Sequence, residues 1–167
     1  MSPFTSIDPK MIVDNPFSLI GDEWMLITAE SGGECNTMTA SWGGVGVLWN
    51  KPVAFAFVRP QRHTYTLLEQ AETFSLSFLP ETYREALRYC GTHSGRDGDK
   101  LTAAGLTLTY QSGTPCIGEA RLVLICRKCY AADLQAERFC DDSLLSYYKA
   151  NDFHRQYIGE ILDVLKA

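Results

Sequence analysis

Short segments with the periodicity or the apolar character of β-strands dominate this chain, and they limit the folds open to it. Residues 73–79, TFSLSFL, place Phe74, Leu76 and Phe78 on one face and two serines on the other. Residues 52–58, PVAFAFV, form an uninterrupted apolar run of the kind found in strands buried on both faces. Further strands are predicted at 24–30, 34–42, 106–110, 119–134 and 157–165.

Helical signals are fewer and shorter. We predict short helices near 65–71, 83–90, 99–105 and 142–150. Thr66 with Glu69, and Thr82 with Glu85, have the spacing of capping boxes, Gly105 would end the third helix, and Asp142 or Ser143 would cap the fourth. With 167 residues, the chain fits a single domain, residues 1–167. The order of elements predicts a mainly β fold, a barrel or sandwich with short peripheral helices, rather than a doubly wound sheet.

The charge of the chain argues against two classes of partner. Its formal net charge is −5 at pH 7, so neither nucleic acid nor an anionic membrane surface is an expected partner. The sequence contains no apolar run of bilayer length, and the start, MSPFTSIDPK, lacks the regions of a signal peptide. We therefore expect a cytoplasmic protein whose six cysteines are reduced thiols.

Three motifs begin like cofactor or metal sites and do not develop into them. GVGVLW starts as a dinucleotide-binding fingerprint, but Trp49 stands where the third glycine belongs. Cys126 and Cys129 form a C-x-x-C pair with no second pair, and residues three apart on a strand face opposite sides. The DGD segment at 97–99 lacks the glutamate that completes a calcium loop, because Leu108 occupies that position. We expect no metal site.

A basic segment follows the apolar strand at 52–58. Arg59, Arg62 and His63 lie within five residues and directly precede a predicted helix. A helix N-terminus carries partial positive charge, and guanidinium groups match the geometry of phosphate. The segment is therefore either an anion site or a solvated basic loop with an ordinary helix start. A second polar loop, THSGRDGDK at 92–100, would add donors to such a site if the fold brings the two together.

Five segments in order resemble a known family. They are NTMTASWGG, KPVAFAFVRPQRHTYTLLEQ, FSLSFL, HSGRDGDK and HRQYIGEIL. The chain resembles the flavin reductase-like family with an FMN-binding split barrel, and within it the flavoredoxin-like branch. The similarity extends from about Phe17 to Val164. It implies an antiparallel split β-barrel with short peripheral helices that forms a homodimer and binds FMN near the subunit interface.

The resemblance also assigns residues to the cofactor. It implies that the flavin ring lies along the NTMTASW strand, at Asn36, Thr37, Met38, Thr39, Ala40, Ser41 and Trp42. It implies phosphate contacts from Arg59, Arg62, Thr64 and Tyr65, and places Ser94, Gly95 and Lys100 near the cofactor. Small side chains let a flat ring approach the backbone, and nearby donors stabilise negative charge on a reduced flavin. The alternative is that Met38, Trp42 and Trp49 are ordinary core residues, which we favour for Trp49 alone.

The resemblance leaves three functional hypotheses. The first is an oxidoreductase that passes electrons from NAD(P)H through FMN to a flavin, a metal or a protein acceptor. The second is a flavoredoxin-like FMN electron carrier that serves a redox protein partner and does not oxidise NAD(P)H directly. The third is a barrel that binds a different phosphorylated ligand. No catalytic residue is evident from the sequence, and His154 and Cys35 are weak candidates, each with a structural role as the alternative.

Overall fold

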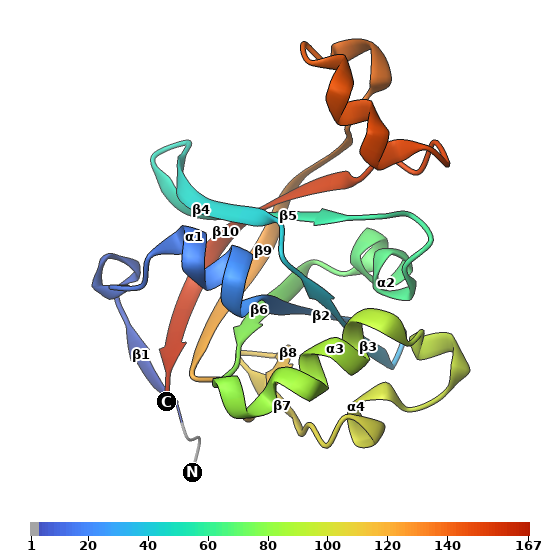
Figure 1. The fold of residues 1–167 in the computed structure, drawn as a ribbon. Coiled ribbons are helices and arrows are strands. Elements are labelled where there is room, and N and C mark those ends of the chain that lie inside the picture. Colours follow the sequence, from blue (N-terminus) through green and yellow to red (C-terminus); the bar gives the residue numbers. More distant parts are fainter. Residues whose placement is uncertain (1–3) are drawn as a thin grey trace.

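The computed structural model describes residues 4–167, which form a curled antiparallel sheet with short helices on its outside (Figure 1). Seven strands follow one another across the sheet in the order β3-β2-β6-β9-β10-β5-β4, and β1 pairs with β10 beside them. The mainly β, antiparallel fold predicted from the sequence is confirmed. The strands are β1 (Thr5–Ile7), β2 (Met25–Ser31), β3 (Glu34–Ala40), β4 (Gly43–Leu48), β5 (Lys51–Val58), β6 (Thr73–Phe78), β7 (Leu108–Gln111), β8 (Thr114–Ile117), β9 (Leu122–Asp133) and β10 (Arg155–Lys166).

The sheet is closed by a very short connection. β3 and β4 are consecutive in the chain, yet they lie at opposite ends of the strand order. Only Ser41 and Trp42 separate them. Because the three steps from Ala40 to Gly43 span at most about 11 Å, the two ends of the sheet must come together at this point.

The barrel divides along the strand β10, because one edge of β10 changes its pairing partner part-way along the strand. One side of β10 pairs with β9 from Arg155 to Lys166. The other side pairs with β5 from Arg155 to Glu160, and then with β1 from Val164 to Lys166. The β5 pairing ends at Val53, next to Pro52, which has no N–H to donate to a ladder.

Both faces of the central strands are covered, which explains the serines of β6. Phe74, Leu76 and Phe78 belong to the core inside the curled sheet. Ser75 and Ser77 face the β7–β8 hairpin instead, where Ser75 Oγ donates to the Pro115 carbonyl at 2.6 Å and Ser77 Oγ accepts the Ile117 N–H at 3.3 Å. A second apolar cluster on this outer side includes Leu26, Leu87 and Ile125.

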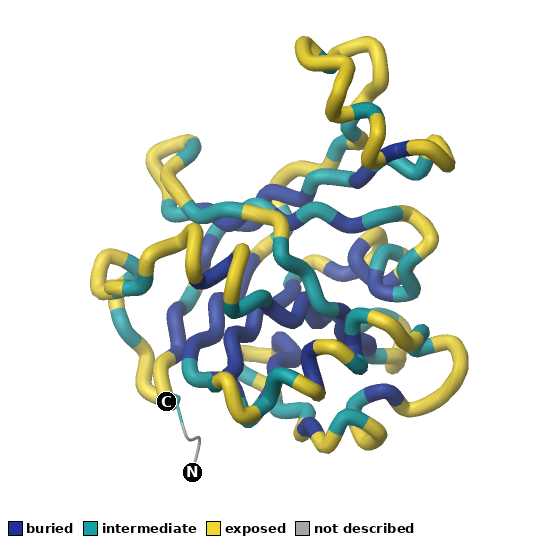
Figure 2. Tube along the Cα trace, viewed as in Figure 1, coloured by how far each residue is buried: buried dark blue, intermediate teal, exposed yellow. Residues whose placement is uncertain are grey.

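Helices and turns occupy the connections. They are η1 (Pro9–Met11), α1 (Pro16–Ser18), the π-turn η2 (Leu19–Glu23), α2 (His63–Gln70), η3 (Glu81–Tyr83), α3 (Arg84–Thr92), η4 (Gly95–Asp97), α4 (Lys100–Ala103), η5 (Ala136–Arg138) and η6 (Asp142–Tyr148). We call residues 134–154, between β9 and β10, the arm. Figure 1 shows the arm standing out from the body, and Figure 2 shows that most of it is exposed. Within the described chain, no helix has both the length and the apolar character needed to cross a bilayer.

Several predicted helix starts are wrong. α2 begins at His63 with Arg62 as its N-cap residue, so Thr66 lies inside the helix and caps nothing. The reason is the turn after β5, where the Arg62 N–H bonds to the Arg59 carbonyl at 3.1 Å and starts the helix early. Thr82 likewise lies in the 3-10 turn η3 that leads into α3.

The predicted helix at 142–150 is a 3-10 helix, η6, and its cap is Asp141 rather than Asp142 or Ser143. Asp141 takes this role because its carboxylate accepts the Ser143 N–H at 3.0 Å. The strands β1, β4 and β8 were not predicted. All six cysteines are free; Cys126 is buried and Cys129 is exposed, at a position where the register between β9 and β10 shifts.

A close approach at Gly159 of β10 gives a stability prediction. A Cβ at this position would lie 2.8 Å from Phe74 Cζ and 2.9 Å from Cys126 Cβ, both buried. We expect Gly159→Ala to lower the free energy of unfolding by roughly 1–3 kcal/mol, since an overpacked core must shift. Gly46→Ala is the control, because nothing lies within 4 Å of a Cβ there. Urea denaturation of both variants tests this, and equal midpoints would contradict it.

Candidate functional site

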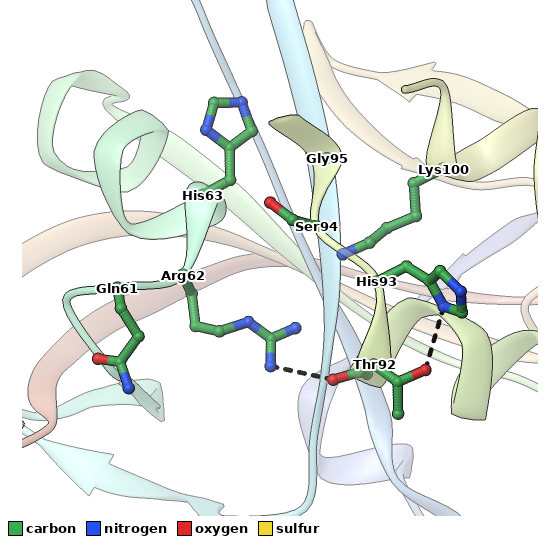
Figure 3. A pocket seen from close by; sticks show the side chains of 9 residues that line it. Gln61, Arg62, His63, Thr92, His93, Ser94, Gly95 and Lys100 are labelled. Carbon is green, nitrogen blue, oxygen red and sulfur yellow. Dashed lines mark hydrogen bonds between the residues drawn. The ribbon is translucent and has the colours of Figure 1, made fainter. Parts of the chain in front are cut away.

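Two hollows meet at Arg62 and together form the candidate site. We call the first the strand hollow; its volume is about 230 Å³. We call the second the loop hollow; its volume is about 200 Å³ (Figure 3). The strand hollow is lined by Met38, Thr39, Ala40, Ser41, Trp42, Phe57, Arg59, Arg62 and His154. The loop hollow is lined by Gln61, Arg62, His63, Gly91, Thr92, His93, Ser94, Gly95 and Lys100.

The strand hollow is formed where the sheet closes. The end of β3 and the Ser41–Trp42 connection supply small side chains on one side, and the end of β5 supplies Phe57. The indole of Trp42 packs against the His154 ring, with ring centroids 5.1 Å apart. This arrangement gives a shallow surface of small groups beside an aromatic wall, which suits a flat ligand.

The loop hollow has an unusual electrostatic character. Lys100 is only 5% exposed, and its Nζ donates to the Thr37 carbonyl at 2.8 Å. Burial, together with the nearby charge of Arg62, lowers the pKa of Lys100 to about 8. Within the described chain, no acidic side chain lines this hollow. A buried ammonium without a carboxylate is costly, and an anion in the hollow would compensate it.

Arg62 is fixed at the junction of the two hollows by the end of α3. Its Nη1 donates to the Gly91 carbonyl and its Nη2 to the Cys90 carbonyl, each at 3.2 Å. A guanidinium carries five N–H donors, so these two bonds orient the group without exhausting it. Figure 3 shows the side chains of Arg62 and Lys100 reaching toward each other across the hollow. Two cations therefore converge on one small space.

Arg59 lines the strand hollow but is engaged elsewhere. Its Nη1 pairs with the Asp152 carboxylate at 2.7 Å, and its Nη2 donates to the Tyr147 carbonyl at 3.0 Å. Gln61 Nε2 also donates to Asp152, at 2.9 Å. Because Asp152 and Tyr147 belong to the arm, Arg59 ties the arm to the end of β5. The two arginines that the sequence groups together thus have different surroundings.

Four of the predicted cofactor residues lie beneath the hollows instead of lining them. Asn36, Thr37 and Thr64 are buried, and Asn36 Nδ2 donates to Thr64 Oγ1 at 2.9 Å. This bond joins β3 to the first turn of α2. Tyr65 packs on the core and lies under the Arg155 guanidinium, 5.5 Å from its ring centre. Asn36, Thr37 and Thr64 therefore have a supporting role, because other residues cover them, while Tyr65 is half-buried and lines neither hollow.

The loop residues Ser94 and Gly95 do line the loop hollow, and Gly95 is required there by packing. A Cβ on Gly95 would lie 2.2 Å from Asn36 Oδ1. Glycine therefore lets the loop close against β3. Ser94 caps the turn η4 by accepting the Arg96 N–H at 3.2 Å. In this way the fold brings together the basic segment at 59–63 and the polar loop at 92–100.

The two weak catalytic candidates differ in placement. His154 lines the strand hollow, and its Nδ1 hydrogen-bonds the Tyr148 hydroxyl at 2.8 Å. Burial and the nearby Arg59 charge lower the pKa of His154 to about 4, so its ring is neutral at pH 7. Cys35 lines neither hollow, and burial and Glu30 raise its pKa to about 12. A thiol in that state is a poor nucleophile.

Sequence reasoning missed part of the lining. Phe57 sits inside a strand that reads as fully buried, although its ring reaches the strand hollow. Cys90 and Gly91, at the end of α3, gave no signal, because they contribute the carbonyl groups that hold Arg62. His63 and His93 were noted only as members of polar segments. His63 borders the loop hollow and pairs with Glu34 on β3.

Comparison with known proteins identifies the family. The sequence profile described as "Flavin reductase like domain" matches residues 17–166. The chain belongs to this flavin reductase-like family. Comparison with curated protein sequences returned no match.

Several solved structures of flavin-binding proteins and reductases are similar to this chain in fold. An FMN-binding domain of a flavin reductase-like enzyme from Shewanella baltica is 16% identical, with a TM-score of 0.72 over 99% of this chain and 78% of that one. Flavoredoxin of Desulfovibrio vulgaris is 20% identical, with a TM-score of 0.69 over 96% and 77%. The NADH:FAD oxidoreductase of Streptomyces globisporus, solved with NAD and FAD fragments, is 22% identical, with a TM-score of 0.66 over 96% and 86%. At these identities the likeness establishes the fold, the split barrel expected from the sequence.

The two converging cations give a prediction about Lys100. Replacing Arg62 with Gln removes a neighbouring positive charge, so we expect the pKa of Lys100 to rise from about 8 toward its ordinary value. Burial, the larger cause, would remain and keep the rise partial. Side-chain NMR of labelled lysine across pH 6–11 measures it, with Arg88→Gln, a surface change on α3, as control. An unchanged titration in Arg62→Gln would contradict the coupling.

Proposed function

We propose that this protein is an FMN-dependent oxidoreductase that takes electrons from NAD(P)H and passes them to a flavin, a metal or a protein acceptor. The observation that carries the proposal is the junction at Arg62 between a shallow hollow of small side chains and a cationic hollow without acidic lining. One ligand with a flat ring and an anionic tail suits both parts. Membership of the flavin reductase-like family supports flavin as that ligand.

FMN fits the residues present. The buried Lys100 ammonium and the Arg62 guanidinium would hold the phosphate, and this would supply the counter-charge that the loop hollow lacks. The surface of Thr39, Ala40 and Ser41 would receive the ring, with Trp42 as its wall. When bound, the flavin supplies reversible acceptance of a hydride or of single electrons.

The remaining residues position the ligand and keep the site rigid. Thr39 Oγ1 donates to the Leu87 carbonyl and holds α3 against β3. His154 is neutral at pH 7, so it offers packing and a hydrogen-bonding edge rather than a charge. Hydride transfer from a nicotinamide needs placement of the two rings and no catalytic acid. The chain accordingly needs no nucleophile at this site.

The proposal includes a homodimer in the cytoplasm. Trp42, which lines the strand hollow, and Tyr147, whose ring packs against it, are 44% and 55% exposed. Aromatic side chains of this size are typical of interface centres. A second subunit packed here would cover the ring-binding surface, in line with the family resemblance.

A second candidate function is an electron carrier of the flavoredoxin kind. Flavoredoxins of Desulfovibrio vulgaris and of Methanosarcina acetivorans share the fold at 20% and 21% identity. In this case reduced FMN would exchange electrons with a redox protein, and NAD(P)H would not react. The same hollows would hold the flavin in both functions.

Single arginine substitutions test the proposed phosphate contact. We expect Arg62→Ala to weaken FMN binding about tenfold or more and riboflavin binding much less, because a charge-assisted bond of about 1.5 kcal/mol or more is lost. Arg59→Ala should weaken both ligands to the same degree, since Arg59 holds the arm. Titration calorimetry measures the four affinities, with Arg88→Ala as a surface control. Equal losses for FMN and riboflavin in Arg62→Ala would remove Arg62 from the phosphate.

Anaerobic reduction separates the two functions. We expect the yellow absorbance of bound FMN to bleach within minutes of adding NADH or NADPH. Typical enzymes turn over about once per second or faster, so reduction should be complete in that time. Dithionite is the control for reducible flavin. A spectrum that bleaches with dithionite and resists both nicotinamides supports the carrier instead. A colourless protein that ignores added FMN would contradict both.

A further inference from the structure

A second cavity lies where the barrel divides. Between Glu160 and Val164, β5 has left β10 and β1 has not yet joined it. The cavity there has a volume of about 710 Å³ and lies between the N-terminal segment at 8–19 and the β4–β5 hairpin. We call it the mouth cavity. Small-molecule sites in proteins commonly measure roughly 300–1,000 Å³ and often occupy the mouths of barrels.

The mouth cavity is apolar in its depth. Its floor consists of side chains of the barrel core: Leu19, Leu122, Leu124 and Ile161, all at least nine-tenths buried. Val45 and Val47 of β4 form one wall, and Val47 is 78% exposed. Apolar surface left open to water around a concave site is a mark of ligand binding.

The charges at the rim are balanced within the protein. Asp8, Lys10, Asp14 and Lys51 line the cavity, two acidic and two basic residues. Asp14 pairs with Arg121 and Lys51 with Glu160, each at 2.8 Å, and the Asp8 carboxylate accepts the backbone N–H of Lys10 at 2.8 Å. A charged ligand would therefore meet no net counter-charge in the lining and would lose its hydration on binding. This balance contrasts with the loop hollow, where Arg62 and Lys100 stand without a carboxylate.

The mouth cavity is separate from the candidate flavin site. The two share no lining residue. They lie at opposite ends of the β4–β5 hairpin, since Phe57 lines the strand hollow while Val47 and Pro52 line the mouth cavity. Figure 1 shows α1 beside β4 on one side of the barrel, and α2 and α3 on the other.

We propose that the mouth cavity binds an uncharged, mainly apolar small molecule, independently of the flavin. Its depth, its core-derived floor and its balanced rim all favour such an occupant over an ion or a charged peptide. This inference stands apart from the proposed redox function and does not require it.

A matched pair of fluorescent probes tests the proposal on the full chain. N-phenyl-1-naphthylamine is neutral, and 8-anilinonaphthalene-1-sulfonate adds a sulfonate to the same ring system. We expect the neutral probe to bind once per chain, with an affinity unchanged by saturating FMN. The sulfonate should bind at least about tenfold more weakly, because its charge is desolvated without compensation.

Two surface variants locate the site. Val47→Trp places a bulky side chain in the cavity wall and should weaken the neutral probe about tenfold. Leu162→Trp adds the same group at an exposed position on β10 outside the lining and should leave the affinity unchanged. Circular dichroism checks that both variants fold.

Four results would overturn the proposal: no binding of the neutral probe, equal affinity for both probes, displacement by FMN, or an unchanged affinity in Val47→Trp. If the neutral probe fails to bind and Val47→Trp also converts a dimer to a monomer in sedimentation, the occupant is a second copy of the chain.

Discussion

The two-residue link between β3 and β4 is the constraint on which the structure depends. It joins the two ends of a seven-strand path, so the sheet has to curl until those ends meet. The strand hollow lies at that meeting point because the link and the ends of β3 and β5 all face it. On the other side of the barrel β10 exchanges β5 for β1, and the mouth cavity follows from that exchange.

The two neighbouring cations of the site, Lys100 and Arg62, lower the stability of the folded chain. Lys100 is buried beside Arg62, and its ammonium donates to the Thr37 carbonyl; burial and repulsion both lower its pKa. A destabilising arrangement of this kind persists only where the surrounding structure holds the side chains in place. Groups whose pKa is shifted in this way are frequently found at functional sites. The cost is relieved when an anion occupies the loop hollow. Ligand binding and stability are therefore coupled through the same two side chains.

Much of the fold could be predicted from the sequence, and the reasons are physical. Strands with strict alternation, such as 73–79, reveal their period directly. β4 was missed because three of its six residues are glycine, which leaves little side-chain pattern to interpret. Helix starts were misplaced at Thr66 and Thr82 because backbone turns after Pro60 and Pro80 begin the helices first. For the site, residue type indicated the cations correctly, but only the fold distinguishes Arg62, held by carbonyl groups, from Arg59, held by Asp152. The sequence alone does not distinguish buried structural residues, such as Asn36 and Thr64, from residues that contact a ligand.

The bond between Arg59 and Asp152 has a mechanical consequence. The arm stands outside the body, yet this ion pair and the Tyr147 carbonyl connect it to a wall of the strand hollow. His154 of the arm also lines the strand hollow, and Trp42 packs against Tyr147 and His154, so a force applied to the arm reaches that wall through several contacts. A partner that binds the arm would therefore move the wall of the strand hollow, and would change the site without contacting the ligand in it.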